Sequence, residues 1–230
     1  MAVYESPAKP FKGSGMEGAL AKWYASHTKK SADEFRSLAR RVFQEVPPGS
    51  SVLEVAPGPG YFAIELAKLG EYQITGLDIS KTFVEIARAN AAKAGVRVDF
   101  QRGNASRMPF GEETFDFLLC RAAFKNFSEP VRALKEMQRV LKRGGRALII
   151  DLRKDASKQD LRRAIKDWKL GAVNGMIVQL TFRFMLLKRA YTKSDFESMI
   201  RETKFASVEI RESLTWLEIT LNRPATPPSG

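Results

Sequence analysis

Hydrophobic residues recur at helical spacing near the start of this chain and in short continuous runs after it. These two patterns predict where helices and strands lie. Within residues 16–46, Phe35, Leu38 and Val42 recur at helical spacing, which predicts helix in two segments. After Pro47, short continuous apolar runs take over and predict strands at residues 51–56, 74–78, 96–100, 115–120 and 147–151. Helical patterns separate most of these strands, at residues 60–70, 81–94 and 129–142.

Strands that alternate with helices indicate an α/β fold, with a parallel sheet covered on both faces. The C-terminal part has a different pattern. Residues 193–203 predict a helix with Thr192 or Ser194 as its N-cap, and strands follow at residues 207–212 and 214–221. The link between these last two strands is so short that we expect them to pair antiparallel.

Composition narrows the class of protein. Hydrophobic residues make up 44% of the 230 residues, which is enough for a packed core and excludes a disordered chain. The single cysteine, Cys120, and the single histidine, His27, argue against a disulfide framework, a zinc site and a histidine triad, so we expect no metal. No apolar run resembles a signal peptide or a membrane span, which favours the cytoplasm.

The formal net charge of +12 first suggests a nucleic-acid partner. However, residues 152–190 carry 10 basic and 3 acidic side chains, whereas residues 51–151 carry 15 and 12. More than half of the excess therefore lies on one short stretch, which also holds the apolar run of residues 176–187. An apolar stretch with a basic exterior is typical of a lid, a dimer interface or a contact with an anionic membrane surface.

A glycine-rich loop follows the first predicted strand, with the sequence Glu-Val-Ala-Pro-Gly-Pro-Gly from Glu54 to Gly60. Gly58 and Gly60 allow a sharp turn and a close approach of backbone to a ligand, and the next helix adds free N–H groups. Asp78 ends the second strand, where a carboxylate can accept both hydroxyls of a ribose. This arrangement predicts a nucleoside site at the carboxyl ends of the first two strands.

The same loop also fits Gly-x-Gly-x-x-Ala, which is typical of NAD(P)-binding proteins. Against that alternative, Glu54 would repel a pyrophosphate, and no Tyr-x-x-x-Lys pair occurs in the sequence. A third interpretation is a tight turn without a ligand.

Taken together, several motifs in order resemble the class I S-adenosylmethionine-dependent methyltransferases over residues 45–150. The motifs are the Glu54–Gly60 loop, Asp78, Gly103-Asn104-Ala105, Phe115-Asp116 with Cys120-Arg121, and Leu141–Gly145. Met108-Pro109-Phe110 and residues 136–140 resemble most the small-molecule members, including the ubiquinone/menaquinone-type enzymes.

Two positions depart from the family pattern. Ala56 replaces the first glycine of the loop, so we expect this position to have a negative φ. Asn104 replaces an aspartate beside the adenine, and we expect its side-chain oxygen to accept a hydrogen bond from the adenine amino group.

The resemblance implies a Rossmann-like sheet of seven strands in the order 3-2-1-4-5-7-6, with strand 7 antiparallel. On this basis residues 1–46 form an N-terminal helical cap and residues 47–151 the cofactor-binding core. Residues 152–190 form a helical lid insertion, residues 191–222 the last helix and strand pair, and residues 223–230 a disordered tail.

The implied activity is in-line methyl transfer from S-adenosylmethionine to a small apolar or aromatic molecule, with S-adenosylhomocysteine as product and no metal. The expected cofactor ligands are Tyr24, Glu54, Ala56, Pro57, Gly58, Gly60, Asp78, Ile79, Asn104, Ala105 and Arg121, the last through its backbone. Phe124, Lys125 and Asn126 are expected to position the acceptor, with Tyr24 and His27 as further catalytic candidates.

An RNA-directed methyltransferase remains an alternative to the small-molecule enzyme, and an NAD(P)-binding protein is another. The loop after the fourth strand lacks the Asn-Pro-Pro-Tyr or Asp-Pro-Pro-Tyr sequence that serves a flipped base, which makes a nucleic-acid partner less favoured. A homodimer or an anionic membrane surface could contact the 152–190 lid.

Overall fold

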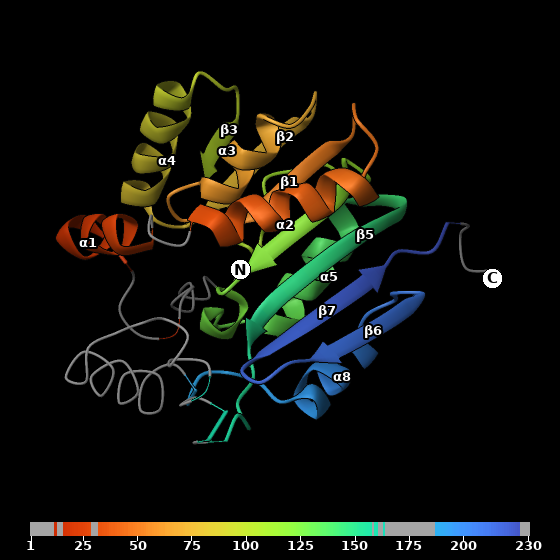
Figure 1. Cartoon of the computed structure of the whole chain (residues 1–230). Helices are drawn as coiled ribbons and strands as arrows, with labels where there is room; N and C mark the ends of the chain where they lie inside the picture. The colour runs from red at the N-terminus through yellow and green to blue at the C-terminus, as the bar shows by residue number, and fades with distance from the viewer. Residues whose placement is uncertain are drawn as a thin grey trace, which may run out of the picture.

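The computed structural model describes residues 12, 16–28, 32–157, 159–160, 163 and 187–225, without the side chain of His27. Helices and strands alternate in the order that the apolar periods predict (Figure 1). The helices are α1 (Gly18–Thr28), α2 (Ala32–Glu45), α3 (Tyr61–Ala67), α4 (Lys81–Ala94), the short 3-10 helix η2 (Phe124–Asn126), α5 (Pro130–Val140) and α8 (Lys193–Arg201). The strands are β1 (Ser51–Val55), β2 (Gln73–Asp78), β3 (Asp99–Arg102), β4 (Phe115–Arg121), β5 (Leu141–Leu152), β6 (Ser207–Glu212) and β7 (Trp216–Asn222).

The strands form one seven-stranded sheet in the order β3-β2-β1-β4-β5-β7-β6. Strands β1 to β5 are mutually parallel, and β7 runs antiparallel to both β5 and β6. This confirms the predicted fold class and strand order. The carboxyl ends of β1, β2 and β4 therefore meet at one edge, where open α/β sheets bind their ligands.

Each face of the sheet buries its own core, which explains why the central strands are continuously apolar. On β4, Phe117 and Leu119 pack in the cluster that includes α2, α3 and α4. Leu118 and Cys120 pack on the other face, in the cluster with α5 and α8. Figure 1 shows the two helical layers with the sheet between them. Because successive residues point to opposite faces, a strand with helices on both sides needs an apolar residue at every position.

Two strands begin three or more residues away from the predicted start. β3 begins at Asp99 rather than residue 96, because Val96 and Val98 pack against the core from the preceding loop while Asp99 pairs with Thr75. β5 begins at residue 141 rather than 147, and it continues through a register shift opposite Phe115. Apolar content alone does not separate these packed loop residues from paired ones.

The prediction of a disordered tail from residue 223 is wrong for its first residues. The backbone N–H of Arg223 donates to the Gly145 carbonyl at 2.9 Å. Its guanidinium donates to the carbonyls of Arg139 and Leu141, and it pairs with Glu113 at 3.0 Å. Arg139 lies in the last turn of α5, so Arg223 supplies a donor to a carbonyl that has no partner within the helix. Residues 226–230 lie outside the described residues.

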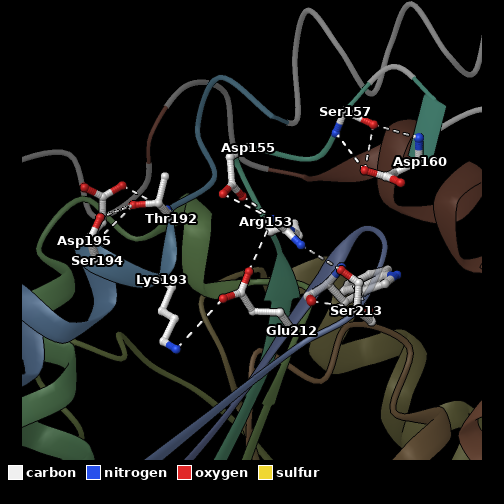
Figure 2. Close-up of polar contacts among 11 residues, drawn as sticks. Arg153, Asp155, Ser157, Asp160, Thr192, Lys193, Ser194, Asp195, Glu212 and Ser213 are labelled. Carbon is white, nitrogen blue, oxygen red and sulfur yellow. Dashed lines mark hydrogen bonds and ion pairs between the residues drawn. The ribbon is translucent and has the colours of Figure 1, made fainter.

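Most of the predicted lid, residues 164–186, also lies outside the described residues. The two ends of the 152–190 insertion run together, because the Lys154 N–H donates to the Tyr191 carbonyl at 3.1 Å. Arg153 lies between Asp155 and Glu212 (Figure 2). Its Nε is 2.9 Å from Asp155 Oδ1, and its Nη2 is 3.2 Å from Glu212 Oε2. Both ends are thus fixed to the edge of β5 and β7. In the described part of the chain, no helix is long and apolar enough to cross a bilayer.

Candidate functional site

The carboxyl ends of β1, β2 and β4 open into a cavity that α1 and α2 border. It gathers most of the side chains that the sequence predicts for the site. These are Tyr24, Glu54, Ala56, Pro57, Gly58, Asp78, Ile79, Asn104, Ala105, Arg121 and Asn126. Gly60, Phe124 and Lys125 lie behind this lining, and the side chain of His27 lies outside the described residues.

The loop after β1 has left-handed backbone at alternate positions, with φ of +56° at Ala56, +55° at Gly58 and +78° at Gly60. Pro57 and Pro59 occupy the positions between them and hold their own φ near −65°. The expectation of a negative φ at Ala56 is wrong. Its N–H donates to the Leu77 carbonyl at 2.8 Å, which holds the turn against β2. A left-handed alanine costs about 1–2 kcal/mol.

The two glycines have different tasks in this loop. A Cβ added at Gly58 would meet no protein atom within 4 Å, so its backbone faces open space in the cavity. A Cβ at Gly60 would lie 2.6 Å from the Phe100 ring and 3.0 Å from Ala87. Gly58 therefore leaves room for a ligand, whereas Gly60 lets the loop pack against β3 and α4.

Asp78 lies at the end of β2, where its carboxylate is 6% exposed. The Gly58 N–H donates to Oδ2 at 3.0 Å and the Ser80 N–H to Oδ1 at 2.9 Å. Burial raises the pKa of Asp78 to about 6, and these backbone hydrogen bonds oppose the rise. Each oxygen keeps a lone pair, so the carboxylate can still accept the two hydroxyls of a ribose. This geometry fits a nucleoside across β1 and β2.

Glu54, on β1, is the second buried carboxylate in the lining of the cavity, and the residue is 4% exposed. The Ala63 N–H, in the first turn of α3, donates to it at 3.2 Å. Burial raises the pKa of Glu54 to about 8, while the charge of Arg121 lowers it. A cationic ligand close to Glu54 would favour its ionised form. The pair of acids therefore suits a positively charged nucleoside, and no cluster of three or more metal-ligand side chains occurs among the described residues.

Asn104 lines the cavity on the side expected for the adenine, with Ile79 and Ala105. Its Oδ1 accepts a hydrogen bond from the Ser106 N–H at 2.9 Å. An amide oxygen has two lone pairs, so Oδ1 keeps one with which it can accept a hydrogen bond from a ligand.

Two of the residues expected to position the acceptor are buried instead. Phe124 is fully buried, with its ring 5.4 Å from Phe127 and 5.1 Å from Phe196. Lys125 is neither solvated nor free to pair with an acceptor, because its Nζ lies 2.9 Å from Asp151 Oδ1. Asn126 and Phe127, the next residues, do line the cavity.

Lys125 and Asp151 hold this segment on the end of β5. The Lys125 N–H donates to Asp151 Oδ2 at 2.8 Å, and its Nζ also donates to the carbonyl of Ala122, which has a φ of +58°. The buried pair thus fastens both sides of the turn that carries Asn126. The sequence offers no local signal for this contact, since the partners are 26 residues apart.

Aromatic rings also line the cavity, and we refer to this part of the lining as its aromatic half. Tyr24, Phe35 and Phe127 line it, and the Tyr24 ring meets Phe83 edge-on at 5.8 Å. Burial raises the pKa of the Tyr24 hydroxyl, and the charge of Arg121 lowers it. No sequence motif predicts Phe35 as a site residue, and its place in the first turn of the amphipathic helix α2 is the local signal for it.

Comparisons with known proteins agree with this geometry. Residues 53–149 match the family model of the methyltransferase domain. The demethylmenaquinone methyltransferase of Deinococcus radiodurans is 36% identical over 107 residues, which are 46% of this chain and 44% of that protein. The ubiquinone/menaquinone biosynthesis C-methyltransferase of Rhizobium meliloti is 30% identical over 176 residues, covering 70% of this chain and 68% of that protein.

Solved structures of methyltransferases have a similar fold. A solved structure from Methanococcus maripaludis, described as an S-adenosyl-L-methionine-dependent methyltransferase, matches with a TM-score of 0.70 at 21% identity, over 95% of this chain and 98% of the other. The chain spans less than half the length of the Deinococcus relative, but more than two thirds of the Rhizobium one. The chain therefore belongs to the class I S-adenosylmethionine-dependent methyltransferase family.

Proposed function

We propose that this protein transfers the methyl group of S-adenosylmethionine to a small aromatic acceptor of the quinol type. The observation that carries the proposal is a single cavity with an acidic half at Glu54 and Asp78 and an aromatic half at Tyr24, Phe35 and Phe127. The names of the relatives support a quinone-type acceptor rather than RNA.

The acidic half would hold the nucleoside. Asp78 would accept the ribose hydroxyls, Gly58 would admit the ligand against the backbone, and Ile79 and Ala105 would pack on the adenine. Glu54 would lie near the methionine end, where its negative charge favours a cation. When bound, S-adenosylmethionine supplies a methyl carbon that is already activated by a positively charged sulfur.

The aromatic half would orient the acceptor and exclude water from it. Phe35 and Phe127 would pack on the ring, and Asn126 and Tyr24 would offer polar groups at its edge. The prediction that Lys125 touches the acceptor is not carried forward, since its ammonium is bound to Asp151. His27 stays a prediction from the sequence alone.

A methyl-transfer assay tests the proposal. The protein is incubated with methyl-labelled S-adenosylmethionine and either reduced 1,4-naphthohydroquinone or total RNA. We expect label in the naphthoquinol and not in RNA, and calorimetry should show binding of S-adenosylhomocysteine but not of NADH. Label in RNA alone, or binding of NADH alone, would overturn the proposal.

The basic 152–190 segment supports a further proposal, contact with an anionic membrane surface or with a second copy of the chain. Its 10 basic side chains against 3 acidic ones attract anionic lipid. Co-sedimentation with vesicles of anionic or neutral lipid, and light scattering of the free protein, separate the two. Binding to neither vesicle and a monomeric mass would remove both.

A further inference from the structure

Arg121 is the only cationic side chain among the described residues that line the cavity. It ends β4, and its guanidinium lies 4.8 Å from the centre of the Phe35 ring and 5.7 Å from that of Trp216. Its side chain is 19% exposed. The fold therefore keeps one partly shielded positive charge on the aromatic wall, and the function proposed above gives it no task.

The described residues leave most of the hydrogen-bonding capacity of this guanidinium unused. Nη2 donates to Glu34 on α2 at 2.6 Å. A guanidinium carries five N–H donors, and this is the one bond that the described residues make with them. Glu34 is 57% exposed, so water screens much of its charge. A molecule in the cavity could therefore engage the remaining donors with little competition.

The charges of the cavity are arranged by half. Glu54 and Asp78 place two buried carboxyl groups on the side of β1 and β2, and a bound cation favours their ionised forms. Arg121 places positive charge at β4, and it opposes the burial that raises the pKa of both Glu54 and Tyr24. β1 lies between β2 and β4, so Asp78 and Arg121 are two strands apart at this edge of the sheet. An anionic oxygen on the acceptor would complement the site.

We propose that Arg121 binds the ionised hydroxyl oxygen of an aromatic acceptor and so selects ring compounds with an ionisable hydroxyl. The inference rests on the proposed function for the aromatic class of the acceptor. The hydroxyl proton goes to solvent, because the guanidinium stays protonated and cannot accept it. The ionised oxygen enriches the ring in electrons, which makes it a better nucleophile. Arg121 is thereby a specificity-determining residue.

A binding experiment tests this without methyl transfer. The probe is 4-nitrophenol, whose ionised form absorbs visible light, titrated in complex with the protein and S-adenosylhomocysteine. An opposite charge at close range lowers a pKa by about 1–3 units. We expect the bound probe to ionise at lower pH than the free probe, and Arg121→Gln to abolish that difference while Arg121→Lys keeps part of it. An unshifted probe, an equal shift in Arg121→Gln, or no binding to the native protein would overturn the inference.

A matched variant distinguishes binding of the probe by Arg121 from a structural contact of Arg121 with Glu34 on α2. Glu34→Gln keeps an acceptor for Arg121 but removes the charge, so it should leave binding of the probe within about twofold. Arg121→Gln should weaken it about tenfold to a hundredfold, the scale of hydrogen bonds to charged groups. Equal losses in both variants would assign Arg121 a purely structural role and refute the proposal.

The affinity for S-adenosylhomocysteine is the remaining control. In Arg121→Gln it should change much less than the affinity for the probe, since Arg121 acts on Glu54 through its charge alone, and a tenfold loss would mean that Arg121 binds the carboxylate of the cofactor instead. If 1,4-naphthohydroquinone is not methylated but the probe still shifts, the acceptor in the proposed function is wrong while the role of Arg121 stands.

Discussion

Replacing Lys125 by Met tests whether the buried ion pair with Asp151 holds the acceptor side of the cavity. The Lys125 Nζ and Asp151 Oδ1 are 2.9 Å apart, and their side chains are 4% and 1% exposed. Removing one partner of such a pair costs about 3–5 kcal/mol, because the other charge stays buried without compensation. Asp151 would keep the N–H groups of Lys125 and Leu152, at 2.8 and 2.7 Å, which places the expected loss near the lower end.

Urea unfolding followed by circular dichroism measures this loss. With a slope of about 3 kcal/mol per molar urea, a loss of about 3 kcal/mol lowers the midpoint by about 1 M. The double variant Lys125→Met with Asp151→Leu removes both charges. It should recover much of the loss, because an apolar replacement of a buried pair is often neutral. Lys125→Arg, which keeps the positive charge, is the control for the loss of the ion pair.

The functional readout differs between the two halves of the cavity. The affinity for S-adenosylhomocysteine should stay the same in Lys125→Met, because Glu54 and Asp78 lie on other strands. The KM for the acceptor should rise, because Asn126 is no longer held. A midpoint within 0.2 M of the native one, or additive losses in the double variant, would refute the reasoning about the pair.

Three further predictions concern the cofactor half. Ala56→Gly should raise the melting temperature by up to about 3 °C, since relief of a left-handed alanine exceeds the entropy that glycine adds to the unfolded chain; a lower value would contradict it. Between pH 4.5 and about 8, folded Glu54 keeps a proton that the unfolded chain loses, so the stability of the cofactor-free protein should fall as pH rises through this window. Thermal melts of Glu54→Gln should lack that slope above pH 6, where the raised pKa of Asp78 no longer contributes, and calorimetry in buffers of different ionisation enthalpy should show less proton release on cofactor binding at pH 7 than in the native protein. Asn104→Asp should tighten S-adenosylhomocysteine severalfold, because one carboxylate oxygen can keep the Ser106 bond while the other faces the adenine amino group; weaker binding would count against it.

The sequence was sufficient for the sheet because burial on both faces forces apolar residues at successive positions of β1, β2, β4 and β5. It was weaker where apolar residues pack without pairing. Val96 and Val98 fill the core from a loop, so the predicted third strand began too early. The ordered position of Arg223 is not predicted, because most of its partners are backbone carbonyls, which leave no trace in a residue pattern, and Glu113 is 110 residues away.

The sequence predicts the site residues whose positions follow from a backbone motif. It does not predict those whose side chains are placed by contacts with residues far away in the sequence. Gly58 and Asp78 follow from loop geometry and strand ends. The burial of Lys125 in η2 depends on Asp151, which lies on β5, and the position of Phe124 depends on Phe196 in α8. Ala56 shows a third case, in which the fold imposes a conformation that the residue itself disfavours.

The reversed direction of β7 allows the two halves of the cavity to change independently of each other. Because β7 runs against its neighbours, its first residue, Trp216, lies at the edge where β1 and β2 end, with its ring near Arg121. The turn of residues 213–215 precedes it and is bonded to Arg153 at the root of the insertion. Substitutions in that turn can alter the acceptor side without touching the strands that hold the nucleoside. In evolution, a change of substrate would therefore not require re-establishing the binding of the methyl donor.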